Sequence, residues 1–408
     1  GLWRISQEPF MASAKWIDNL VVRASYGLQG NIDKNTSPFL LGNYRIENIL
    51  PGGSEDMIDV SGAPNKKLRW EKTHSVNAGF DFAVLNQAIN LSVDYYYRKG
   101  VDLIGTQMLP LETGFEMLTV NWASMRNQGV EVALSTRNVH TKNFMWTTNF
   151  NFAYNNNKVL KEALREDALE PGREGYPAGA LFALKTAGLD EEGYPMFQDK
   201  DGKAVSAMEF FKLQEWGFGA TDLTARERRE LYTYVGTADC PYTGGFNNTF
   251  TYKAFELGVN FSFDFGGKVR SQPTYSIVDF DKGRNTNRDI LNRWTPENTE
   301  TIFPVLLSQN ERLDEYMWYS NQNEIYRNLD IWIRDLNYVR LQNIRLGYTL
   351  PTNFTRTLGM TSATVAIEGR NLLVFGSSYK NYLDPETMSN AYATPAPKSV
   401  TLSLNLIF

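Results

Sequence analysis

The 408-residue sequence predicts an all-β fold, in which long antiparallel strands form part of a transmembrane β-barrel. Three observations lead to this prediction. Apolar and polar residues alternate with a period of two, tight and long connections alternate between the resulting segments, and aromatic residues gather near the segment ends. A helical membrane protein is excluded, because no stretch approaches the roughly 18 uninterrupted apolar residues of a membrane helix.

The period-two alternation defines the strands. From Ile89 to Tyr97 every second residue is apolar or aromatic, and most residues between them are polar; the same pattern runs from Leu257 to Phe265. An α-helix would scatter these apolar residues around its circumference. Several segments reach the roughly 9–11 residues that a tilted strand needs to cross a bilayer. We expect ten strands near residues 20–29, 73–84, 88–103, 124–138, 142–156, 244–253, 254–267, 336–350, 361–374 and 398–408.

The connections between these strands follow a regular order of lengths. Tight links are expected at residues 85–87, 139–141, 253–254 and 351–360. Long connections are expected at residues 30–72, 104–123, 157–243, 268–335 and 375–397. Outer-membrane barrels have this asymmetry, with short periplasmic turns and longer extracellular loops. A soluble β-sandwich has no reason to keep every long loop at one end, so the pattern favours the barrel.

Aromatic residues lie near both ends of the expected strands, as the interfacial girdles of a barrel require. Those near the short-turn end are Phe80, Phe82, Trp146, Phe250, Tyr252, Tyr348 and Phe408. Those near the long-loop end are Tyr95, Tyr97, Phe152, Tyr154, Phe263 and Phe265. The alternative is that they form the core of a large β-sandwich.

Composition excludes several functions. The formal net charge is −5 and no basic face emerges, which argues against nucleic-acid binding. The single cysteine, Cys240, excludes an internal disulfide and a cysteine-rich zinc site. The start at Gly1-Leu2-Trp3-Arg4 has no initiator methionine and no signal-peptide pattern. We therefore expect the chain to begin inside a longer protein.

Nine segments, taken together and in order, are typical of one family. They are Leu20–Gly30, Leu68–Thr73, Asn127–Glu131, Tyr242–Phe250, Trp294–Asn298, Asn337–Pro351, Gly369–Leu373, Asp384–Glu386 and Ser399–Phe408. In these segments the chain resembles the C-terminal part of the SusC/RagA family, the TonB-dependent outer-membrane transporters of Bacteroidetes. Val235–Cys240 departs from a Gly/Asp-rich turn that many members carry, so no metal site is carried over there.

The resemblance implies a plugged barrel of 22 strands, a count typical of large outer-membrane transporters. Residues 1–408 would supply the last ten strands, leaving the plug and twelve strands in an N-terminal portion. The implied function is import of oligosaccharides or peptides across the outer membrane, energised by TonB through the plug. A SusD-like surface lipoprotein would lid the barrel, and Phe408 would be the C-terminal assembly signal. No cofactor is implied.

The long connections supply candidate binding residues. Aromatic faces can stack on sugar rings or pack against apolar peptide side chains, while their polar tips form hydrogen bonds. The alternative is that such residues pin long loops to one another or to a partner protein. The candidates are Trp216, Phe218, Tyr232 and Tyr234 in residues 157–243, and Trp318 and Tyr319 in residues 268–335.

Asp94, Glu131, Asp264 and Glu368 fall on polar, inward-facing positions of the expected strands. Paired carboxylates can serve catalysis, but polar inward faces are the rule in large barrels, so we interpret these residues as the wall of a hydrated lumen. His74, His140 and Cys240 have no evident nucleophile or base partner, and no enzyme is predicted.

Two acidic segments could be mistaken for calcium loops. Asp190–Glu192 and Asp199–Gly202 lack the twelve-residue EF-hand pattern, and Asp-Gly beside a short strand usually marks a turn. We therefore predict turns and no metal site. Leu223–Tyr232 is expected to form a short charged helix with a threonine cap.

Two other functions remain open. One is a TonB-dependent receptor for a metal chelate or a vitamin, which would favour a more self-contained pocket. The other is a soluble carbohydrate-binding or adhesive β-protein, which would be extracted without detergent.

Overall fold

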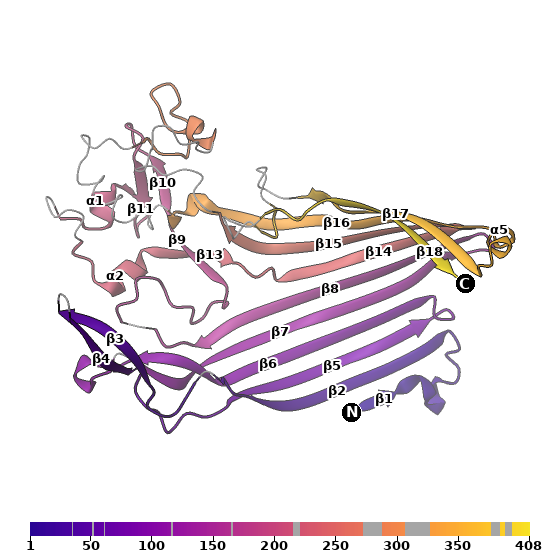
Figure 1. The fold of residues 1–408 in the computed structure, drawn as a ribbon, viewed down its shortest axis with the longest axis horizontal. Helices are drawn as coiled ribbons and strands as arrows, with labels where there is room; N and C mark the ends of the chain where they lie inside the picture. The colour runs from indigo at the N-terminus through magenta and orange to yellow at the C-terminus, as the bar shows by residue number, and fades with distance from the viewer. Residues whose placement is uncertain are drawn as a thin grey trace. The chain divides into compact units, whose positions relative to one another are not determined.

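The computed structural model describes residues 1–34, 36–50, 53–60, 62–115, 117–164, 166–214, 221–271, 288–306, 327–376, 384–387 and 394–408 (Figure 1). The chain divides into two compact units. Unit 1 comprises residues 1–165 and 172–178, and unit 2 comprises residues 166–171 and 179–408. Among the described residues, no helix has the length and apolar character needed to cross a membrane.

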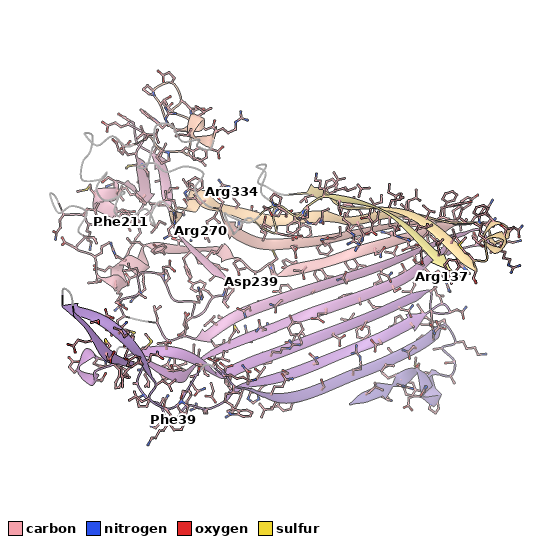
Figure 2. The ribbon with its side chains drawn as sticks, in the orientation of Figure 1. Phe39, Arg137, Phe211, Asp239, Arg270 and Arg334 are labelled. Carbon is pink, nitrogen blue, oxygen red and sulfur yellow. The ribbon has the colours of Figure 1, made fainter. Side chains whose placement is uncertain are left out.

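Unit 1 is an antiparallel meander in the order β1-β2-β5-β6-β7-β8. Its strands are β1 (Leu2–Arg4), β2 (Ile17–Asn31), β5 (Glu71–Val84), β6 (Ile89–Met108), β7 (Met117–His140) and β8 (Phe144–Lys161). The neighbouring strands β5 to β8 run side by side in Figure 1. Phe39 lies at the long-connection end of this unit and Arg137 at the short-turn end (Figure 2).

Unit 2 continues the same architecture in the order β14-β15-β16-β17-β18. Its long strands are β14 (Tyr242–Tyr252), β15 (Phe255–Arg270), β16 (Ile333–Thr349), β17 (Ser362–Phe375) and β18 (Ser399–Ile407). Arg270 and Arg334 mark the ends of β15 and β16 that adjoin the long connections (Figure 2).

Two of the tight connections contain residues with positive φ, as short turns between antiparallel strands require. Leu85, Asn86 and Gln87 between β5 and β6 all have positive φ, at 58°, 54° and 57°. Lys253, between β14 and β15, has φ 53°. Positive φ at the turn residues matches the right-handed twist of paired strands. The link between β16 and β17 instead contains a short helix, α5 (Thr352–Thr357).

The long connections carry their own structure. In unit 1, β3 (Gly42–Leu50) and β4 (Gly53–Val60) form a separate hairpin. In unit 2, short strands and helices surround an apolar cluster that includes Leu184, Phe197 and Leu329. These elements are β9 (Ala180–Leu184), β10 (Thr186–Leu189), β11 (Pro195–Gln198), β12 (Ala204–Val205), β13 (Tyr232–Thr237), α1 (Ala207–Phe210), α2 (Ala225–Glu230), η4 (Arg288–Asn292) and η5 (Asp330–Trp332). We call this group the loop subdomain. The remaining 3-10 turns are η1 (Ile5–Gln7), η2 (Pro9–Met11) and η3 (Leu111–Thr113).

All ten expected strands are confirmed, and most extend a few residues beyond their expected limits. The expected short helix is also present as α2, whose N-cap Thr224 forms a capping box with Glu227. The short strands of the long connections were not expected. Strands of two to six residues are too short for a period of two to be visible.

Candidate functional site

A polar network lies on the face of unit 1 that the sequence predicts to point inward. The Arg23 guanidinium on β2 pairs with Asp81 on β5 at 3.0 Å and with Asp94 on β6 at 3.0 Å. It also donates to the Ser92 hydroxyl at 3.2 Å. Because these side chains are only half-buried, each ion pair contributes about 1 kcal/mol at most. The network therefore suits a wall that faces water.

Gly79 makes room for this network. The strand register places Gly79 directly between Arg23 and Asp94. A Cβ atom at this position would lie 2.2 Å from the Asp94 carboxylate and 2.7 Å from the Val93 carbonyl oxygen. The missing side chain thus lets the Arg23 guanidinium reach across β5 to Asp94. Glu131 on β7 lies directly opposite Asp94 in the register, as its predicted inward position requires.

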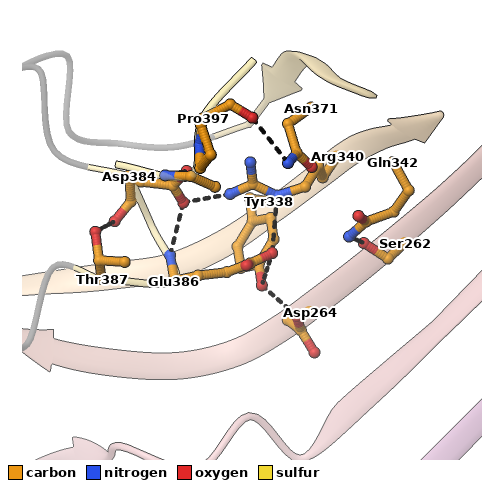
Figure 3. Close-up of polar contacts among 11 residues, drawn as sticks. Ser262, Asp264, Tyr338, Arg340, Gln342, Asn371, Asp384, Glu386, Thr387 and Pro397 are labelled. Atoms are coloured by element: carbon orange, nitrogen blue, oxygen red, sulfur yellow. Dashed lines mark hydrogen bonds and ion pairs between the residues drawn. The ribbon is translucent and has the colours of Figure 1, made fainter. Parts of the chain in front are cut away.

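A second polar network lies on unit 2 (Figure 3). The Arg340 side chain on β16 is only 2% exposed; it pairs with the carboxylate of Asp384 and, at 2.8 Å, with that of Glu386. The Tyr338 hydroxyl donates to Asp264 on β15 and lies 3.4 Å from Glu386. We call these five residues the Arg340 network. It joins two neighbouring strands to a segment of the last long connection.

Asp384 organises that connection as well as pairing with Arg340. Its carboxylate accepts the backbone N–H groups of Glu386 at 3.0 Å and of Ala396 at 3.2 Å. The Asn371 side chain on β17 donates to the Pro397 carbonyl at 3.2 Å (Figure 3). Residues 384–387 and 394–398 are thereby fixed against β16 and β17. Glu368, the remaining predicted inward carboxylate, pairs with Arg370 at 2.6 Å.

The predicted loop aromatics fall into two groups. Trp216, Phe218, Trp318 and Tyr319 lie outside the described residues. Tyr232 and Tyr234 lie on β13, opposite Leu184 and Phe182 of β9. Tyr232 packs against the apolar cluster of the loop subdomain, and burial raises the pKa of its hydroxyl. Tyr234 is 37% exposed and contacts Phe182 edge-on, with ring centroids 5.9 Å apart.

A groove of about 540 Å³ opens on the loop subdomain between α2 and the turn after β11. Val205, Phe210 and Leu223 contribute apolar lining. Two exposed ion pairs cross it, Lys200 with Glu230 and Lys212 with Glu227, each at 3.3 Å. The backbone N–H and the hydroxyl of Thr224, together with Lys212, lower the pKa of Glu227 to about 2.

The two acidic segments form turns. The Asp190 carboxylate accepts the backbone N–H groups of Glu192 and Tyr194, at 3.0 and 2.8 Å. The Asp199 carboxylate does the same for Asp201 and Lys203, at 3.0 and 2.7 Å. Each aspartate thus closes its own hairpin. In the part of the chain that the structure describes, no three histidine, cysteine, aspartate or glutamate side chains are grouped as metal ligands.

The hairpin formed by β3 and β4 presents an apolar face to solvent. Tyr44, Ile46 and Ile58 are 67%, 64% and 69% exposed. The register places Tyr44 opposite Ile58. The opposite face is polar, because Arg45 pairs there with Glu47 at 3.5 Å and with Asp59 at 3.8 Å. Asp56 lies opposite Ile46 on the same face, which is otherwise apolar and exposed.

Comparison with known proteins identifies the architecture. Residues 10–198 match the family model described as TonB dependent receptor-like, beta-barrel. Over its whole length the chain is 26% identical to TonB-dependent receptor P3 of Formosa agariphila, and over 99% of its length it is 25% identical to TonB-dependent receptor SusC of Bacteroides thetaiotaomicron. This chain is related to the SusC-type TonB-dependent receptors. The family prediction from sequence is confirmed.

The structural comparison agrees with the sequence relationship. The RagAB peptide transporter structure superimposes on the whole chain with a TM-score of 0.75 at 22% identity, which confirms the β-barrel fold class. This chain covers 41% of TonB-dependent receptor P3, 39% of SusC and 42% of the RagAB chain. It therefore spans about two fifths of the length of these relatives. The family relationship also confirms the predicted location in the outer membrane.

Two arginines of the candidate site were missed by sequence reasoning. Arg23 and Arg340 lie in the segments Leu20–Gly30 and Asn337–Pro351 that carry the resemblance to TonB-dependent receptors. Each occupies an inward strand position near carboxylates. Each arginine lies on the polar side of the period-two alternation of its predicted strand. That position is the signal that would have identified them.

Proposed function

We propose that the chain forms part of the wall of an outer-membrane transporter that imports oligosaccharides or peptides with energy delivered through TonB. Its inward polar networks, set against an apolar outer face on the same long strands, carry this proposal. They give the wall a hydrated interior, as a nutrient path requires. The chain itself performs no catalysis in this proposal.

The plug and the remaining strands would come from an N-terminal portion of the same transporter. In the described part of the chain, β18 pairs with β17 alone, and its Val400, Leu402 and Leu404 side chains are 68%, 76% and 62% exposed. An open strand edge in lipid leaves unpaired backbone groups, each costing several kcal/mol. We propose that Ser399–Phe408 pairs with the first strand of that portion. Disulfide crosslinks between engineered cysteines on the two strands would test this pairing, and their absence would contradict it.

We propose a SusD-like surface lipoprotein as the partner that lids the mouth. The apolar face of the β3–β4 hairpin and the long connections 157–243 and 268–335 supply the surface for it. The substrate would be held between this lipoprotein and the plug. The accessible aromatic Tyr234 is one candidate contact, together with the predicted aromatics outside the described residues.

Shortening residues 268–335 tests the function. If the flanking strands β15 and β16 are spared, the barrel should still assemble, because these strands pair directly with each other from Phe255–Tyr348 to Arg270–Ile333. We expect a folded protein that imports poorly or loses its lipoprotein. The measurements are substrate uptake by cells and co-purification of the lipoprotein. Normal uptake with undiminished co-purification would contradict a role for this connection.

A further inference from the structure

Four basic residues form one row across four adjacent strands of unit 1. The register places His74 of β5 opposite Lys99 of β6, Lys99 opposite Arg126 of β7, and Arg126 opposite Lys158 of β8. These strands lie side by side in Figure 1. Directly opposed residues of antiparallel strands project from the same face, with Cβ atoms about 5 Å apart. We call these four residues the basic row.

The basic row lies on the apolar face of the sheet. Because side chains alternate along a strand, the residues that share its face are found at every second position toward the short turns. These include Val76, Phe80, Val93, Tyr95, Val132 and Phe152. The opposite face carries the Arg23 network. The row therefore borders the surface that faces lipid in the outer membrane.

The position of the basic row along the strands matches a membrane interface. On β5, Phe82 near the short turn lies eight residue steps from His74, which is about 26 Å of strand at ~3.3 Å per residue. With a strand tilt of ~40° this becomes about 20 Å along the membrane normal, compared with an apolar band of ~25 Å. Short turns lie on the periplasmic side. The row thus lies near the outer leaflet surface.

Among the residues that the structure describes, no carboxylate pairs with the lysines and the arginine of the basic row. The Arg126 Nε is buried without a hydrogen-bond partner in this part of the chain. Like charges directly opposite one another on neighbouring strands are destabilising. On the inward face, by contrast, Arg23 has two aspartates.

We propose that the basic row binds the phosphate-bearing headgroup of a lipid of the outer leaflet. Arginine offers a planar fork of donors that fits phosphate, and lysine adds a point charge on a flexible stem. The stems of Lys99 and Lys158 can lie along the apolar face while their ammonium groups reach the headgroup. The acyl chains would cover the apolar residues below. This proposal rests on the membrane location and adds a lipid site to the transporter.

Binding of a defined lipid to the intact transporter tests the proposal. Phosphatidic acid is the probe, phosphatidylcholine the comparison without net charge, and native mass spectrometry in detergent gives the affinity. The variant Lys99→Gln/Arg126→Gln/Lys158→Gln should bind phosphatidic acid about 100-fold more weakly, at about fivefold per cation. The control Arg98→Gln/Arg137→Gln/Lys142→Gln removes the same charge outside the row and should bind like the wild type.

Three results would overturn the proposal. They are equal loss in the variant and control proteins, no loss in either, and binding of inorganic phosphate that is as tight as binding of phosphatidic acid. A second variant, Lys99→Glu, does not depend on the triple variant folding. It places a carboxylate opposite His74 and Arg126, so the Tm of the lipid-free protein should rise and phosphatidic acid binding should fall. A lower Tm with unchanged lipid binding would also overturn it. Extraction from membranes without detergent would instead refute the membrane location itself.

Discussion

At the scale of single residues, the two arginine networks differ in how far their charged side chains are exposed to solvent. The Arg23 network is half-buried, so water shares in stabilising its charges. In the Arg340 network the Arg340–Asp384 pair is almost fully enclosed, with side chains 2% and 6% exposed. Removing one partner of a buried pair leaves an uncompensated buried charge, and this costs about 3–5 kcal/mol. The two networks should therefore respond very differently to mutation.

Asp384→Ala tests this difference. We expect it to lower the free energy of unfolding by about 3–5 kcal/mol, because Arg340 keeps a buried charge with only Glu386 as a partner. The matched control is Glu230→Gln, which removes an exposed partner of Lys200 and should cost less than about 1 kcal/mol. Urea unfolding of the intact transporter gives both values. Equal effects of the two substitutions would contradict the role assigned to Asp384.

Sequence reasoning could not find the Arg340 network as a unit. Arg340 and Asp384 are 44 residues apart, and their contact depends on how the connection after β17 folds back. Asp94 and Asp264 were predicted to face the lumen; each joins a polar network in the structure, and their lumen-facing position stays a prediction. Period-two alternation determines on which face of the sheet a strand residue lies, but it does not identify the residue's partner.

At the scale of elements, the long strands could be predicted because their alternation is local and extends over many residues. The hairpin of β3 and β4 was hidden inside an expected long connection. Its alternation was visible at Tyr44 and Ile46, and Pro51-Gly52-Gly53 supplies a turn signal between the two strands. The strands of the loop subdomain could not be found in this way, because tertiary packing around Leu184 and Leu329, rather than alternation, defines them.

The hairpin offers a test of the proposed partner. The double variant Tyr44→Ser/Ile58→Ser removes apolar area from the exposed face, so it should weaken lipoprotein binding while leaving barrel stability unchanged. The control Arg45→Gln/Glu55→Gln changes the opposite face of the same hairpin. Co-purification of the lipoprotein is the measurement. Retention of the lipoprotein by the apolar variant, or equal loss from both variants, would contradict docking on this face.

At the scale of the whole molecule, each unit has the same construction: long antiparallel strands with one polar face, predicted to point inward, and one apolar face, predicted to point outward. The outward face of β15 carries Leu257, Val259, Phe261 and Phe263, and the register sets Phe261 opposite Phe246 and Leu341. The Phe246 and Phe261 rings stack with centroids 4.7 Å apart. This outward apolar surface is the basis of the membrane location.

The measurement that tests this account most directly compares two neighbouring positions of β15. Arginine near mid-membrane on a lipid-facing position costs about 2–4 kcal/mol, whereas an inward position tolerates polar side chains. Phe261→Arg should therefore strongly reduce the amount of assembled barrel in the outer membrane, and Asn260→Arg should leave it close to that of the wild type. Heat-modifiable migration of the extracted protein gives the assembled fraction. Equal assembly of the two variants, or greater loss with Asn260→Arg, would contradict the assignment of this face to lipid.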